Sequence, residues 1–168
     1  MKAWLGLLLG VWICSGDCQE RRLTIPLIDP GTGTFYVESD LGDGLTTRML
    51  VDTGSSFSTL SDAMLRRLQQ EDRGNVVYLR SQQGVLADGQ AISVPLYRIG
   101  RLRIGGQCLL ENVVVAVFPH SRRAILGLNT LARLSPFSIS VDPPEIHLSG
   151  CQGREMASGQ KPSLAAAP

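Results

Sequence analysis

Lysine is almost missing from this chain: of its 16 basic residues only Lys2 and Lys161 are lysines, and 15 acidic residues leave a net charge of +1. A nucleic-acid-binding domain carries a clustered excess of basic residues, so this balance does not favour a nucleic-acid partner. Aromatic residues are also few, at 5%, but 43% of the residues are hydrophobic. This composition is typical of a globular protein, and 168 residues allow one domain with a sizeable core.

Several catalytic motifs are missing as well. Histidine occurs only at positions 120 and 147, and neither an H-E-x-x-H motif nor a Cys/His spacing typical of zinc sites is present. The G-x-S-x-G motif of serine hydrolases and a glycine-rich phosphate-binding loop are absent too. The sequence therefore implies no metal or other cofactor and no serine nucleophile.

The chain also lacks an apolar run long enough to cross a bilayer, which needs about 20 residues. An apolar stretch from Ala3 to Ile13 follows Lys2 and precedes small residues near Gly16. This pattern is typical of an export signal. We expect residues 1–16 to be a signal peptide, with an uncleaved N-terminal anchor as the alternative, and we expect no stable membrane span after its removal.

The remaining chain divides by composition. Residues 17–22 form a short N-terminal segment, and residues 23–150 carry the patterned hydrophobic sequence of a domain. Residues 151–168 are small, polar and proline-containing, so they are expected to be a disordered tail.

Cysteine is scarce, and its number becomes odd once the signal is removed. Cys18, Cys108 and Cys151 would then remain in a compartment where disulfides persist. Cys18 and Cys151 flank the domain, so we expect them to pair if the termini meet. Cys108 would then be left as a small buried apolar residue.

Short strand-like segments dominate the domain. Turn sequences at Gly42-Asp43-Gly44 and Asp88-Gly89 are typical of tight hairpins. Long helices between strands are missing, so the pattern predicts an all-β sandwich or barrel and no parallel sheet. The expected strands lie at 23–27, on both sides of each turn, and at 108–118, 137–141 and 145–149; the expected helices lie at 60–70, capped by Ser61, and from Asn129.

One stretch, "MLVDTGSSFSTL" at residues 49–60, stands out. An apolar strand ends at Asp52 and is followed at once by Thr53, Gly54 and Ser55. A carboxylate at the end of a buried strand pays a desolvation cost unless it is paired or hydrogen-bonded. Asp52 is therefore either a capped turn residue or a residue that carries out chemistry.

This stretch resembles the active-site loop of the retropepsin-like aspartic proteases (clan AA), and it is similar to the bacterial single-domain envelope members. The second landmark of that family, an apolar pair and glycine before a short helix, is matched by Ile125, Leu126 and Gly127. The resemblance covers roughly residues 33–148. It implies a closed β-barrel or sandwich with one or two short helices and a flap hairpin whose substrate-binding tip is Ala87, Asp88, Gly89 and Gln90.

The resemblance also implies a mechanism. Two neighbouring carboxylates share one proton, so that one acts as the base for a water and the other as the acid. Because the chain holds only one D-T-G, the second Asp52 must come from an identical chain across a two-fold axis. In this family pattern Thr53 bonds the partner loop, Gly54 offers its N–H to the carboxylate and Ser55 donates a further hydrogen bond.

The resulting hypothesis is an exported aspartic-type endopeptidase of the bacterial periplasm or cell envelope, active as a homodimer on peptide or protein substrates. The flap has neither a glycine-rich tip nor an aromatic residue, and a residue such as Asp88 is more often a turn residue than a ligand. Two alternatives remain. The fold can be kept as a catalytically weak peptide-binding or dimerisation module, or the enzyme can process only itself or one partner.

Overall fold

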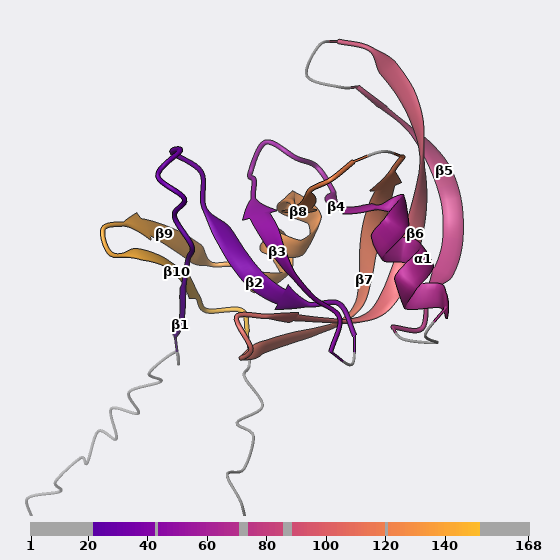
Figure 1. Cartoon of the computed structure of the whole chain (residues 1–168). Coiled ribbons are helices and arrows are strands. Elements are labelled where there is room, and N and C mark those ends of the chain that lie inside the picture. The colour runs from indigo at the N-terminus through magenta and orange to yellow at the C-terminus, as the bar shows by residue number, and fades with distance from the viewer. Residues whose placement is uncertain (1–21, 43, 71–73, 86–88, 120, 152–168) are drawn as a thin grey trace, which may run out of the picture.

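The computed structural model describes residues 22–42, 44–70, 74–85, 89–119 and 121–151. Ten strands and three short helical segments make up this part of the chain. Figure 1 shows how they are arranged. The strands are β1 (Leu23–Pro26), β2 (Tyr36–Asp40), β3 (Thr46–Val51), β4 (Ser58–Ser61), β5 (Val77–Val85), β6 (Ala91–Ile104), β7 (Cys108–Phe118), β8 (Ala124–Leu126), β9 (Phe137–Val141) and β10 (Pro144–Leu148). The helices are α1 (Asp62–Gln70), α2 (Leu128–Leu131) and the 3₁₀ segment η1 (Ala132–Leu134).

Six of the strands close into a barrel. The large sheet has the order β2-β3-β8-β4-β7-β6-β5, and β2 also pairs with β6, which joins the two sides of the sheet and leaves β5 outside the ring. The all-β barrel predicted from the sequence is therefore confirmed. Its interior is filled by fully buried aliphatic side chains, among them Met49, Leu60, Leu102 and Leu126.

The barrel contains two parallel strand pairs, which the sequence analysis did not predict. β3 runs parallel to β8, and β4 runs parallel to β7. Parallel neighbours need a crossover connection, usually a helix. Here α1 and the hairpin β5–β6 lie between β4 and β7, and β4 to β7 lie between β3 and β8 in the sequence. The absence of long helices was therefore a misleading signal.

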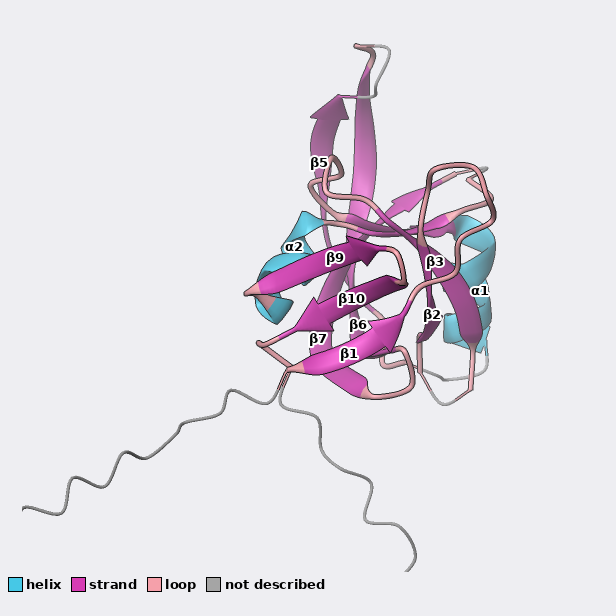
Figure 2. Cartoon of the chain, turned by 90° about the vertical axis from the view of Figure 1, so that its left-hand side faces the viewer, coloured by secondary structure: helices cyan, strands magenta, loops and turns pink. Residues whose placement is uncertain are grey.

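A separate three-stranded sheet, with the order β1-β10-β9, packs against the barrel (Figure 2). Ile25, Ile146 and Ile139 lie side by side across it on one face. Ile25 and Ile146 are buried in the core, whereas Ile139 lies at the β9 edge and is 37% exposed. The sheet therefore covers the barrel with β1 and β10 but leaves the apolar end of β9 open.

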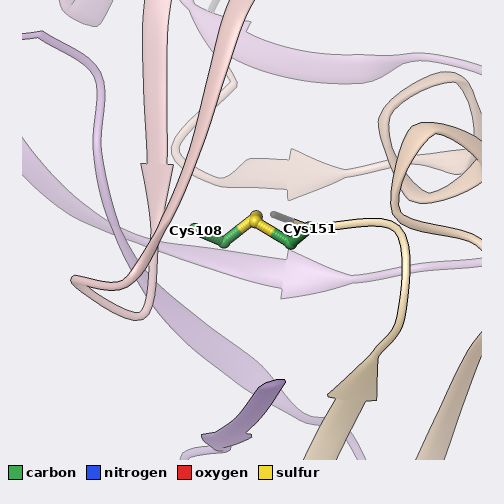
Figure 3. Close-up of a disulfide and its surroundings, with 2 residues drawn as sticks. All are labelled: Cys108 and Cys151. Atoms are coloured by element: carbon green, nitrogen blue, oxygen red, sulfur yellow. A yellow bond between two sulfur atoms is a disulfide. The ribbon is translucent and has the colours of Figure 1, made fainter. Parts of the chain in front are cut away.

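A disulfide joins Cys108 and Cys151, with 5.8 Å between their Cα atoms (Figure 3). The expected pairing of Cys151 with Cys18 is therefore wrong, and Cys108 is not a free thiol. After β10 the chain turns back over the barrel, where the N–H groups of Ser149 and Gly150 donate to Pro136 and Leu134. This path lays Cys151 against the start of β7, and it is buried there although the sequence placed it in the tail.

The local predictions agree with the structure at most turns and caps. Both hairpins form, β2–β3 and β5–β6. The Ser61 hydroxyl accepts a hydrogen bond from the Met64 N–H and so caps α1. The second helix begins at Leu128, one residue before the predicted Asn129.

The predicted signal peptide at 1–16, Cys18 and residues 152–168 of the expected tail lie outside the described residues. Within the part of the chain that the structure describes, no helix is long and apolar enough to cross a membrane.

Candidate active site

The barrel places Asp52 directly after the end of β3, where it is half-buried. Its main-chain N–H donates to the carbonyl of Leu126 at 3.1 Å and so continues the parallel pairing of β3 with β8. The two sequence landmarks, which lie 75 residues apart (127 − 52), therefore meet at one end of this strand pair. Thr53 and Gly54, which follow, are exposed.

A tight turn holds the Asp52 side chain. The Gly54 N–H donates to Asp52 Oδ1 at 2.9 Å, as the sequence predicted. A Cβ at position 54 would lie 3.2 Å from the same oxygen, a tight contact that would require the Asp52 carboxylate to shift. The N–H of Ser55 donates to the Asp52 carbonyl at 3.4 Å. The further hydrogen bond expected from the Ser55 side chain stays a prediction.

Gly127 packs directly against the loop of residues 52–57 between β3 and β4, called the Asp52 loop below. A Cβ at this position would lie 2.4 Å from the carbonyl carbon and oxygen of Phe57, so no side chain fits there. Beyond the glycine, the N–H of Leu128 donates to the Ser55 carbonyl at 2.8 Å and the N–H of Asn129 donates to the Ser56 carbonyl at 3.1 Å. The start of α2 thus fixes the shape of the Asp52 loop.

A buried polar network, which the sequence analysis missed, strengthens this junction. The Ser58 hydroxyl accepts from the Gly127 N–H at 3.0 Å and lies 2.7 Å from the Thr130 hydroxyl. The Asn129 side chain accepts from the Ser58 N–H and donates to the Val114 carbonyl, both at 2.7 Å. The sequence shows these residues only as alternating hydroxyl groups and a helix start, so their pairing was hidden.

The hairpin β5–β6 rises beside the Asp52 loop and curves over it in Figure 1. Of the four expected flap residues, Gly89 and Gln90 are exposed, and Gly89 has a φ of +86°, which fits a hairpin turn. Ala87 and Asp88 lie outside the described residues. Val85, at the end of β5, is 75% exposed.

Between this hairpin and the Asp52 loop lies a hollow of about 410 Å³. Gly54 and Ser55 line it from the loop side, and Gly84 and Val85 line it from the hairpin side. Phe57, Phe118 and Val94 contribute apolar surface. The hollow can therefore hold an extended peptide next to the Asp52 loop.

The family of this chain follows from comparison with known proteins. The aspartyl protease family model matches residues 37–130, more than half of the chain, and this range contains both landmarks. The chain belongs to the aspartyl protease family. A general role as an aspartic protease follows from this membership.

A solved structure supports the fold. The retropepsin-like aspartic protease of Rickettsia conorii superposes with a TM-score of 0.51 at 17% sequence identity, over 76% of this chain and 90% of that one. At this identity the likeness establishes the fold alone, and the fold is retropepsin-like. No curated protein matches the sequence.

Proposed function

We propose that this protein is an aspartic endopeptidase in which Asp52 of two identical chains activates one water molecule. The proposal rests on the burial and the hydrogen bonding of the Asp52 carboxylate. It is half-buried beside the peptide-sized hollow, and the only hydrogen bond recorded for it among the described residues comes from its own turn, at Gly54. A single carboxylate can act as the base for water, but it cannot at the same time act as the acid that hydrolysis of a peptide bond needs.

A second Asp52 supplies that acid. Two carboxylates within a few ångströms cannot both ionise cheaply, so they hold one proton between them. The ionised member takes a proton from water while the protonated member polarises the scissile carbonyl. Thr53 is exposed next to Asp52, which leaves its hydroxyl accessible to a partner loop.

The unpaired edge of the three-stranded sheet at β9 supports the proposal of a dimer. β9 is an edge strand, and its apolar face continues past the barrel at Ile139 and Val141, which are 37% and 70% exposed. An exposed edge with apolar residues is a site for pairing with another chain. The opposite face of the same strand is polar, with Ser138 and Ser140. We infer that the β9 edges of two chains meet in the dimer.

Replacing Ile139 and Val141 by lysine is expected to weaken the dimer by at least about tenfold, because each charge would be buried at the interface. Sedimentation or sizing across a dilution series measures this, and specific activity should fall on dilution earlier than in the wild type. Ser138→Lys, on the polar face of the same strand, is the matched control and should dimerise normally. Unchanged dimerisation of the double variant would place the interface elsewhere.

The rate should depend on pH through the shared proton. We expect maximal kcat/KM at mildly acidic pH and a steady fall toward alkaline pH, because loss of that proton removes the acid. A pH–rate profile with a neutral peptide tests this. A rate that still rises through about pH 9 contradicts a carboxylate pair.

The proposal also concerns the compartment in which the protein works and whether it cleaves the peptides that it binds. The buried Cys108–Cys151 disulfide supports export to an oxidising compartment such as the bacterial periplasm or cell envelope. N-terminal sequencing of the protein purified from cells would show whether residues 1–16 are removed.

The alternative of a peptide-binding module predicts a dimer that binds peptides and cleaves none, even at high enzyme concentration.

A further inference from the structure

The hollow beside Asp52 is one end of a longer groove. On β7 the side chains of Val114, Ala116 and Phe118 alternate onto one face, and Val94 and Leu96 on β6 lie on the same face. These residues form a small apolar cluster that is separate from the main core. Because the cluster is contiguous along two strands, it provides a continuous apolar floor.

A second hollow, of about 340 Å³, continues this floor away from Asp52. Phe57 lines both hollows, so the two adjoin at this residue. Leu96 and Val114 form part of the second floor, and the β5 wall continues from Gln82 to Arg80. The two hollows are therefore consecutive sections of one groove along β5, β6 and β7.

The far section carries positive charge. Arg80 and Arg133 line it, and both are exposed. Arg133 is held in place because its guanidinium donates to the carbonyls of Glu111 and Asn112, at 2.8 and 3.4 Å. Arg80 donates to the Gln82 side chain at 3.3 Å, which directs it along the groove wall.

No carboxylate is present among the described residues that line either hollow. Glu111, next to Asn112 in sequence, lines a different hollow with Arg101 and Gly42. The charges of Arg80 and Arg133 are therefore not neutralised by a salt bridge recorded within the groove. A bound acidic side chain would complement them.

We propose that Arg80 and Arg133 form an accessory subsite for an acidic side chain of the peptide substrate, about four to six residues from the scissile bond. From Val85, beside the Asp52 loop, to Arg80 is five residues of strand, which is about 17 Å. An extended substrate covers this length with a similar number of residues. In a two-fold dimer each chain offers one such subsite, so either end of the substrate can use it. This inference rests on the proposed endopeptidase function.

The test uses a fluorogenic peptide selected from a library for cleavage by the wild-type protein. Glutamate is compared with glutamine at each position three to seven residues from the scissile bond. The wild type is expected to prefer glutamate by roughly three- to tenfold in kcat/KM at one or two of these positions, and less at high salt. In the double variant Arg80→Gln/Arg133→Gln this ratio should fall to about one.

Controls separate charge from folding. Arg48→Gln, an exposed arginine paired with Glu38 on β2 and outside the groove, should keep the ratio. Arg80→Lys retains the charge and should keep most of it. If the Arg133 variant does not fold, because its anchoring bonds are lost, Arg80→Gln alone should reduce the ratio.

A wild-type ratio of one at every position, or a ratio that the double variant retains, overturns the subsite. A wild type that cleaves no library peptide and does not process its own chain overturns the proposed function instead. In that case fluorescence anisotropy of the wild-type protein, with pools of extended library peptides that carry either glutamate or glutamine at one position, still decides the inference. Preferential binding of the glutamate peptides, lost in the arginine double variant, supports it, and equal binding overturns it.

Discussion

Asparagine at position 52 is expected to lower kcat/KM by at least about a thousandfold while the protein still folds and dimerises. General acid–base catalysis contributes about 10²–10⁴ in rate, and this substitution removes both the base and the shared proton from each active site. The amide can still accept the Gly54 N–H bond that holds the turn. Peptide cleavage, circular dichroism and sedimentation of the same preparation would measure the loss together with the intact dimer.

Asp29→Asn is the matched control. The Asp29 carboxylate accepts a hydrogen bond from the N–H of Gly31, two residues on, at 2.7 Å, the same local arrangement as Asp52 with Gly54. If Asp52 were only a capped turn residue, the two substitutions would have similar small effects. Cleavage that persists in Asp52→Asn would remove this residue as the catalyst.

The local geometry around Asp52 could be predicted from the sequence wherever the signal was local. The Asp52 turn needs a short polar residue and a glycine two residues later, so its shape can be inferred from three letters. The hairpin turns and the Ser61 cap are likewise made by residues close in sequence. The family resemblance joined Asp52 to Gly127, and the structure shows the physical reason: the Phe57 backbone occupies the space of a Cβ at Gly127.

What the sequence could not provide were contacts between distant segments. Ser58 and Thr130 form one buried network although they are 72 residues apart, and nothing near either residue indicates its partner. The parallel pairs were missed for the same reason, because β3 and β8 meet only after the chain has passed through most of the barrel. The groove along β5, β6 and β7 depends on the side-chain alternation of these three strands and on their register.

The disulfide shows how this limit affects a definite prediction. From three cysteines after the signal, position in the chain favoured Cys18 with Cys151, but pairing is decided by which side chains the fold brings within reach. β7 begins next to the point where the chain returns after β10. The bond therefore connects the barrel to the end of the three-stranded sheet that carries the proposed dimer edge.

Replacing both Cys108 and Cys151 by alanine is expected to lower the free energy of unfolding by about 4 kcal/mol. The bond closes a loop of 43 residues, and the chain-entropy relation gives this value for a loop of that length. For a domain of this size the loss corresponds to a fall in Tm of roughly 10–20 °C. Thermal unfolding without reductant measures it.

Two comparisons make the disulfide prediction specific. Reductant should lower the Tm of the wild type toward that of the double variant and leave the variant unchanged, because only the wild type has the bond to lose. Cys18→Ala should unfold like the wild type, since Cys151 is already bonded to Cys108. An equal Tm for the double variant and the wild type under oxidising conditions would contradict a stabilising bond. The bond anchors the segment after β10. The dimer of the double variant should therefore also dissociate at a higher protein concentration than the wild-type dimer. This result would link the redox state of the compartment to assembly of the paired Asp52 site.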